Sequence, residues 1–273
     1  MSADRVQIKT ENHVAEVAMV RSDKHNALDG EMFQAMADAA ARLADEPGVR
    51  AVVLHGEGPS FCSGIDVGWL AGEAKNLEHE FTKRDEFGAN LFQRVSTAWL
   101  EVPVPVIAAI QGNCLGGGLQ IALGADIRLA TADAKLSVRE VHWGLVPDMG
   151  ITATLPRLLP LDVAKELTFT GKIVSGEEAA ELGLVTRVEA DPLAAARELA
   201  AEIAGRSPHA VRAAKRLYEH TWHEGGRAGL ELESELQFGL IGSPNQMAAV
   251  IAGVSKQPGE FTDPESVSRA ASR

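Results

Sequence analysis

Cysteine is scarce in this 273-residue sequence, which contains only Cys62 and Cys114. The two residues form no CxxC motif and have no metal-ligand spacing to histidine, which argues against a disulfide framework and against a zinc site. No run approaches the roughly 20 apolar residues that cross a bilayer, and the N-terminal residues lack the apolar stretch of a signal peptide. We therefore expect a protein of the reducing cytoplasm, without membrane insertion.

Basic residues are also few compared with acidic ones: the sequence has 26 Lys and Arg residues and 38 Asp and Glu residues, which gives a formal net charge of −12. Such a field repels nucleic-acid backbones, so nucleic acid is excluded as the expected partner. A small anion is not excluded, because Arg21, Lys24 and His25 are close enough in sequence to bind phosphate within a Debye length of roughly 8–10 Å. The composition is otherwise that of a folded globular protein.

Hydrophobic patterns predict strands that alternate with helices up to about residue 200. Strands separated by helices imply parallel βαβ units, so the predicted fold class is α/β. The expected strands are a hairpin within residues 5–20 and single strands within residues 50–58, 103–112 and 126–131. The expected helices lie within residues 31–45, 84–102 and 119–125.

Beyond residue 200 the pattern is helical. Ser175 is followed by Glu178 at the spacing of a capping box, and the pairs Asp191-Pro192 and Ser207-Pro208 each place a cap before a proline at the first helical position. Residues 206–254 read as amphipathic helix, which predicts a region that covers the core or packs against another subunit. We therefore divide the chain into a core, residues 1–200, and a C-terminal helical region, residues 201–273.

Two glycine-containing turns follow predicted strands. The run Gly116-Gly117-Gly118 leads from a strand into a helix, and Ser63-Gly64 ends another strand-like segment before a helix that begins near Asp66. Ligands bind at the carboxyl ends of strands in open α/β sheets, and unpaired backbone N–H groups at such turns can hold an anion or an oxyanion. Taken singly, the glycine run is more often a structural turn than a site, and Asp66 more often a helix N-cap.

Two carboxylates lie in the segment "VREVHWGLVPDMG", residues 138–150. Glu140 has apolar neighbours, which would raise its pKa toward a range useful for acid–base catalysis. Asp148 could instead be a turn residue or the N-cap of a helix in residues 151–159, and Glu140 could be a salt-bridge partner of Arg139 or of a second chain.

The ordered set "HNALD", "FCSGID", "PVIAAIQGNCLGGGLQIALGADIRLA" and "VREVHWGLVPDMGITATLPRLL" resembles the crotonase (enoyl-CoA hydratase/isomerase) superfamily over nearly the full chain. The resemblance implies a crotonase-like spiral of ββα units with a helical C-terminal trimerisation region. It also implies an acyl-CoA substrate, a homotrimer or homohexamer, and no metal or cofactor, since coenzyme A is part of the substrate.

By position, the resemblance makes the amides of Ile65 and Gly117 an oxyanion hole for the thioester enolate. Losing one such donor typically costs on the order of 100- to 1,000-fold in rate. The adenosine-diphosphate end of coenzyme A would dock at Lys24, His25 and Ala27. The remaining expected substrate contacts are Ser63, Gly64, Asp66, Gly116 and Gly118.

The reaction depends on the side chains that face the acyl group. Hydratases of the superfamily carry two glutamates, one at the position of Glu140 and one where this chain has Gln120, whose carboxamide is not a base. Glu140 with Asp148 resembles the 3,5-dienoyl-CoA to 2,4-dienoyl-CoA isomerases, although those have an aspartate in place of Gln120. We therefore expect an isomerase in which Asp148 removes the C2 proton, Glu140 delivers a proton at the far end of the diene, and Gln120 gives polar support.

Three alternatives stay open: a 3-enoyl to 2-enoyl isomerase that uses Glu140 alone, a weak hydratase, and a non-catalytic acyl-CoA-binding homologue. Trp69, Trp143 and Met149 could line an acyl tunnel or belong to the core.

Overall fold

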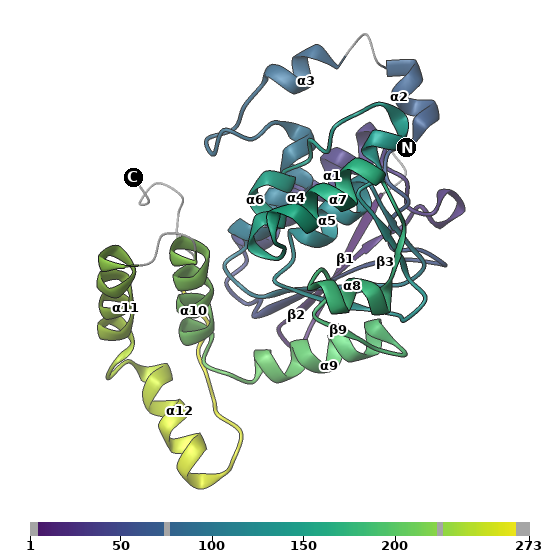
Figure 1. Ribbon diagram of the computed structural model, residues 1–273. Coiled ribbons are helices and arrows are strands. Elements are labelled where there is room, and N and C mark those ends of the chain that lie inside the picture. Colours follow the sequence, from purple (N-terminus) through teal and green to yellow (C-terminus); the bar gives the residue numbers. More distant parts are fainter. Residues whose placement is uncertain (1–4, 74–76, 223–225, 266–273) are drawn as a thin grey trace.

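The computed structural model describes residues 5–73, 77–222 and 226–265 of the chain (Figure 1). A six-stranded sheet with the order β1-β2-β3-β4-β6-β9 forms its centre. The hairpin predicted in residues 5–20 is confirmed, with antiparallel β1 and β2 joined by Asn12 and His13, both at positive φ. All later neighbours in this sheet are parallel, which confirms the α/β fold class. The strands are β1 (Val6–Glu11), β2 (Val14–Met19), β3 (Ala51–Gly56), β4 (Val106–Ile110), β6 (Ile127–Ala130) and β9 (Arg187–Val188).

Both faces of the central sheet are buried, because alternate residues of each strand point to opposite sides. In β3, Val52 and Leu54 join the main hydrophobic core, whereas Ala51 and Val53 join a second, smaller core. Helix α9 (Pro192–Ala204) covers the second face in Figure 1 and contributes buried Ala196 and Ala200, four residues apart on one side of the helix. Helices α1 (Gly30–Ala44), α4 (Leu91–Glu101) and α5 (Gly117–Leu123) provide buried residues to the main core.

A small second sheet holds the glycine run beside the segment that carries Glu140. Its order is β5-β7-β8, formed by β5 (Asn113–Leu115), β7 (Lys135–Ser137) and β8 (Val174–Ser175). The Gly116 amide, just after β5, donates a 2.8 Å hydrogen bond to the Ser137 carbonyl at the end of β7. After β7, Val138 and Arg139 lead into the short 3-10 helix η2 (Glu140–Trp143).

Helix caps confirm three predicted starts and correct a fourth. The side chains of Ser175, Asp191 and Ser207 accept hydrogen bonds from backbone amides three residues later, at α8 (Gly176–Leu182), α9 and α10 (Pro208–Thr221). The helix predicted in residues 84–102 is wrong for residues 84–90, since Asn90 and Gln93 form a capping box that starts α4 at Leu91. The other elements are α2 (Val67–Glu73), α3 (Glu78–Thr82), α6 (Ile151–Thr154), α7 (Leu161–Thr170), α11 (Arg227–Leu240), α12 (Pro244–Ser255), η1 (Ser22–Lys24) and η3 (Leu155–Arg157).

Helices α10, α11 and α12 extend away from the sheet in Figure 1. Helix α10 is anchored by Lys215, whose buried ammonium lies 2.7 Å from Asp126 and donates to the carbonyls of Trp99 and Val104, both at 3.1 Å. The three helices expose large apolar side chains, among them Tyr218, Phe238 and Val254. Packing of this region against another subunit stays a prediction, as does the division near residue 200. No helix in the described ranges is long and apolar enough to cross a membrane.

Candidate functional site

The two predicted turns lie side by side because the strand ends that precede them pair with each other. The Phe61 and Cys62 amides donate to the carbonyls of Gln111 and Asn113 at 2.8 and 2.9 Å, and the Leu115 amide returns a 3.0 Å bond to Cys62. The segment before Gly64 is therefore fixed against the segment before Gly116. Both cysteines of the sequence lie in this seam as buried free thiols.

Glycine is required in both turns by space as well as by conformation. Gly64 has a φ of +91°, and a Cβ there would lie 2.7 Å from the Leu115 carbonyl oxygen. A Cβ on Gly118 would lie 2.3 Å from the carbonyl oxygen of Cys62. Real Cβ atoms do not approach backbone oxygens so closely, so the glycines allow the two turns to meet. Gly118 thus packs between the turns and does not line the cavity described next.

Ile65 and Gly117, the expected oxyanion donors, line one cavity. Leu28 fixes the first turn by donating to the Gly64 carbonyl at 2.8 Å and accepting from the Asp66 amide at 2.9 Å. Within the part of the chain that the structure describes, neither the Ile65 nor the Gly117 amide donates a hydrogen bond to the protein. Two fixed N–H donors without internal acceptors can stabilise negative charge on a ligand oxygen.

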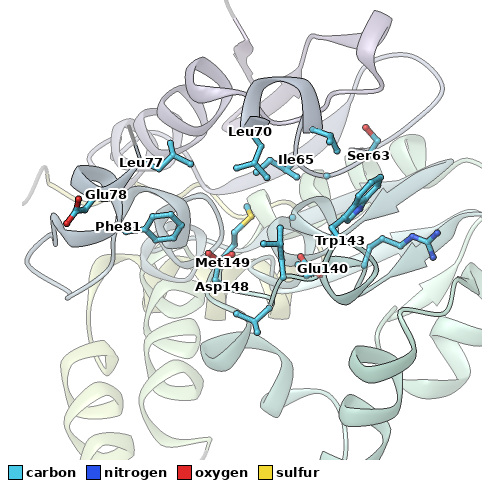
Figure 2. A pocket seen from close by; sticks show the side chains of 17 residues that line it. Ser63, Ile65, Leu70, Leu77, Glu78, Phe81, Glu140, Trp143, Asp148 and Met149 are labelled. Atoms are coloured by element: carbon cyan, nitrogen blue, oxygen red, sulfur yellow. The ribbon is translucent and has the colours of Figure 1, made fainter. Parts of the chain in front are cut away.

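The cavity has a volume of about 540 Å³ and lies between two walls formed by different segments of the chain. Figure 2 shows Ile65 and Leu70 on one side and Glu140, Asp148 and Met149 on the other, with Leu77 and Phe81 at one end and Ser63 and Trp143 at the opposite end. Apolar side chains form most of its surface. The lining residues are Ser63, Gly64, Ile65, Val67, Leu70, Leu77, Glu78, Phe81, Gly116, Gly117, Arg139, Glu140, Trp143, Leu145, Val146, Asp148 and Met149.

Glu140 is the most buried carboxylate of the cavity, with 9% of its surface exposed. Its Oε1 accepts a 2.6 Å hydrogen bond from Gln120 Nε2, while its Oε2 is buried and has no partner among the described residues. Burial raises the pKa of Glu140, and the nearby charge of Asp148 raises it further. The salt bridge considered for Arg139 is not formed, because Arg139 donates to the Gly171 carbonyl at 2.9 Å.

Asp148 lines the same cavity from the segment before α6, with more than a third of its surface exposed. Neighbouring atoms still remove part of its hydration, and this desolvation raises the pKa of the Asp148 carboxyl. The alternative role of Asp148 as a helix N-cap is wrong, since Gly150 occupies that position and no side chain caps α6. Two carboxylates with raised pKa values in one cavity can hold and exchange a proton.

Gln120 is almost fully buried in α5, behind the cavity wall. Its carboxamide bridges two residues, donating to Glu140 and accepting a 2.9 Å bond from the Met149 amide. Gln120 does not line the cavity itself, so it reaches a ligand only through its neighbours.

The residues expected at the adenosine-diphosphate end lie next to the Ser63 end of the cavity. The Ser63 amide donates to the His25 carbonyl at 2.9 Å, and the side chains of Lys24 and His25 are exposed, whereas Ala27 is buried. Arg21 is not a free cation, since it pairs with Asp66 at 2.8 Å. Asp66 also accepts hydrogen bonds from the Gly68 and Trp69 amides at the start of α2, so it acts as a cap and does not line the cavity.

The sequence left two places possible for Trp69, Trp143 and Met149, an acyl tunnel or the core. Of these three side chains, Trp143 and Met149 line the cavity. Trp69 packs on Phe33 with ring centroids 5.7 Å apart, outside the cavity lining. Leu70, Leu77 and Phe81 also line the cavity and were not predicted from the sequence. Leu77 and Phe81 are four residues apart, and this helical spacing was the available signal.

A sheet of parallel strands, a pair of free amides and two desolvated carboxylates define an acid–base site that can handle a carbonyl compound. Within the described ranges no group of three or more His, Cys, Asp or Glu side chains is placed to hold a metal ion. Comparison with known proteins gives the class. Residues 9–264 match the family described as enoyl-CoA hydratase/isomerase.

Individual relatives carry different activities in their names. The Delta(3,5)-Delta(2,4)-dienoyl-CoA isomerase of Mus musculus is 34% identical over 213 residues, which span 75% of this chain and 65% of that protein. The carnitinyl-CoA dehydratase of Proteus mirabilis is 34% identical over 220 residues, 79% of this chain and 80% of that protein. The structure of an enoyl-CoA hydratase from Bacillus anthracis superposes with a TM-score of 0.86 at 29% identity, covering 94% of this chain and 98% of that one.

The chain therefore belongs to the enoyl-CoA hydratase/isomerase family, within the crotonase superfamily, and it is an enzyme of that superfamily. The crotonase-like fold expected from the sequence is confirmed.

Proposed function

We propose that the protein isomerises 3,5-dienoyl-CoA to 2,4-dienoyl-CoA by moving a proton between two carboxylates. The observation that carries this proposal is that Glu140, Asp148, Ile65 and Gly117 all line one cavity. Family membership supplies the acyl-CoA substrate class. The name of the mouse relative, a dienoyl-CoA isomerase, supports this choice of reaction among those found in the family.

The reaction begins with loss of a proton from C2, next to the thioester carbonyl. As the C–H bond breaks, its electron pair delocalises and negative charge builds on the carbonyl oxygen. The Ile65 and Gly117 amides donate to this oxygen and stabilise the enolate, which is conjugated with the two double bonds. Protonation of C6 then leaves double bonds at C2 and C4, so one proton has left the substrate and one has entered it.

The difference in burial between Glu140 and Asp148 suggests which carboxyl group donates a proton and which removes one. Glu140 is the more enclosed carboxyl group, and its pKa is raised by burial and by the charge of Asp148, so we assign the proton donor role to Glu140. Asp148 is then the ionised member and removes the C2 proton. Glu140 delivers its proton at C6, and the exposed carboxyl group of Asp148 returns its proton to solvent or to the pair before the next turnover.

The shape of the cavity suits a coenzyme A thioester in one direction. The Ser63 end lies beside exposed Lys24 and His25, which would contact the phosphates, and the opposite end is formed by Leu77 and Phe81 for the acyl chain. The chemistry is proton transfer alone and calls for no cofactor. A cytoplasmic homotrimer or homohexamer remains the expected form of the enzyme.

A second candidate is conversion of 3-enoyl-CoA to 2-enoyl-CoA by Glu140 alone. The burial of Glu140 at the cavity and its raised pKa favour it, because one such carboxyl group could take a proton from C2 and return it to C4. Hydration is less favoured, since Gln120 is engaged at both ends of its carboxamide and is not a base.

The test is turnover of three thioesters by the purified protein: a 3,5-dienoyl-CoA, a 3-enoyl-CoA and a 2-enoyl-CoA. We expect the dienoyl substrate to give the highest kcat/KM, followed as the growth of conjugated-diene absorbance. Preferred turnover of the 3-enoyl substrate would replace the proposal by the second candidate. Hydration of the 2-enoyl substrate as the main activity, or acyl-CoA binding without turnover, would contradict both.

A further inference from the structure

The orientation of the Gln120 carboxamide is fixed by chemistry. The Met149 amide donates a 2.9 Å hydrogen bond to it, and an N–H group cannot donate to an NH₂ group, so the oxygen of Gln120 must face Met149. The NH₂ group consequently faces Glu140, 2.6 Å from Oε1. Since all three residues are buried, no water competes for this arrangement at its core.

This orientation divides the two oxygens of Glu140 into different roles. Oε1 accepts a hydrogen bond from the Gln120 NH₂ group, and the carbonyl oxygen of a carboxylic acid is a better acceptor than its hydroxyl oxygen, so this bond favours the proton on Oε2. Oε2 is buried and no described residue contacts it with a hydrogen bond. A proton held by Glu140 therefore occupies Oε2, the oxygen that the protein leaves free.

Building on the function proposed above, we propose that Gln120 is a positioning residue: by donating to Oε1 it orients the Glu140 carboxyl group and keeps the transferable proton on Oε2. Gln120 acts through Glu140 and does not touch the reacting carbons. Its hydrogen bond also opposes part of the effect of burial on the pKa of Glu140, because it stabilises the ionised form that exists after proton delivery.

The Gln120→Glu variant separates this role from a structural one. A protonated glutamate can copy Gln120, accepting from Met149 with one oxygen and donating to Glu140 with the other. An ionised glutamate still accepts from Met149 but no longer donates to Glu140. We expect kcat near that of wild type at acidic pH, then a fall of about tenfold per pH unit once residue 120 ionises, in a range where wild type stays active.

Other charged groups around Glu140 do not change in this variant. Asp148, Arg139 and Glu78 line the cavity with it, and α7, which packs on η2, turns Asp162, Lys165 and Glu166 to solvent. The matched control is Gln34→Glu, the same change at an exposed position on α1, which should leave the pH profile of kcat unaltered. A wild-type profile for Gln120→Glu would overturn the proposal.

A second measurement needs neither turnover nor a folded Gln120→Glu variant. Infrared difference spectra of wild type at decreasing pH report the C=O band of protonated Glu140, identified by its absence in Glu140→Gln. We expect the frequency of a hydrogen-bonded carbonyl, which rises in Gln120→Met, where the donor is lost. A free carbonyl in wild type would refute the proposed proton position.

The two readouts distinguish this inference from the proposed function. If wild type fails to isomerise the dienoyl thioester but shows the bonded band, the function is wrong and the positioning stands. The pH series is then run on whichever thioester turns over. If isomerisation proceeds with a free carbonyl band, only the positioning fails.

Discussion

The two walls of the cavity differ in how deeply their residues are buried and in how polar they are. The inner wall, formed by Gly116, Gly117, Glu140 and Met149, belongs to or contacts α5, whose seven residues are all buried. The outer wall, formed by Val67, Leu70, Leu77 and Phe81, belongs to or adjoins α2 and α3, neither of which contains a buried residue. Polar groups of the inner wall are linked by hydrogen bonds, whereas the outer wall offers apolar surface.

This difference separates chemistry from recognition. Proton transfer needs donor and acceptor within hydrogen-bond reach, and a misplacement of about 1 Å can cost about 100-fold in rate. An alkyl chain has no directional contacts, so its wall can adjust with little loss. We therefore expect changes in the inner wall to affect kcat strongly, and changes in the outer wall to affect chain-length preference.

The largest effect is expected when either carboxylate of the pair is neutralised. Glu140→Gln and Asp148→Asn should each lower kcat about 100- to 10,000-fold, the usual contribution of a general acid or base. Diene formation at saturating substrate measures it. Asp133→Asn, which alters an exposed aspartate outside the cavity, is the control and should keep the wild-type rate. Equal rates for wild type and Asp148→Asn would remove Asp148 from the mechanism.

The junction of the two turns comes next. Gly118→Ala places a Cβ 2.3 Å from the Cys62 carbonyl oxygen, so the turns must separate, at a cost of about 1–3 kcal/mol in the free energy of unfolding. Both Tm and kcat should fall. Gly239→Ala has open space in α11 and should be neutral or slightly stabilising, since alanine favours helix more than glycine does. A Gly118→Ala protein with wild-type Tm would contradict the packing described.

The outer wall should show a smaller and selective effect. Phe81→Ala removes apolar contact from the end of the cavity, and we expect kcat/KM for a long acyl chain to fall about tenfold relative to a short one. Phe169→Ala, an exposed phenylalanine outside this cavity, is the matched control. If kcat fell equally for all chain lengths, the outer wall would share in the chemistry and the distinction between the walls would be lost.

The smallest effect concerns stability and pH. Burial raises the pKa of Glu140 above its ordinary value of 4.5, so the folded state binds this proton more tightly than the unfolded chain. The resulting stability is present below the ordinary pKa and is lost as pH rises through the raised value. The Tm of Glu140→Gln minus that of wild type should therefore increase from acidic toward neutral pH. Thermal unfolding across this range measures it, and a constant difference would mean that the pKa of Glu140 is not raised.

Much of the inner wall could be predicted from the sequence, because the glycines, Glu140 and Asp148 fall in short motifs that carry the family resemblance. The order of parallel strands followed from alternating patterns. The start of α4 could not be placed from the helical pattern alone, since a local capping box at Asn90 decided it. The outer wall was missed because Leu70 and Phe81 become neighbours of the site only through tertiary structure.

The roles of Asp66 and Gly118 illustrate the same limit. Both lie in motifs of the site, yet Asp66 caps α2 and pairs with Arg21, and Gly118 packs against Cys62. Position in a motif does not distinguish a residue that contacts substrate from one that holds its neighbours. That distinction required the cavity surface itself.

Deuterium incorporation by the wild-type enzyme probes the carboxylate pair most directly. Conversion of a 3,5-dienoyl-CoA in D₂O should give 2,4-dienoyl-CoA with deuterium at C6, because Glu140 exchanges its proton with solvent before delivering it. Deuterium at C4, in a 2,5-dienoyl product, or recovery of the substrate without conversion, would show that Glu140 does not deliver a proton at C6.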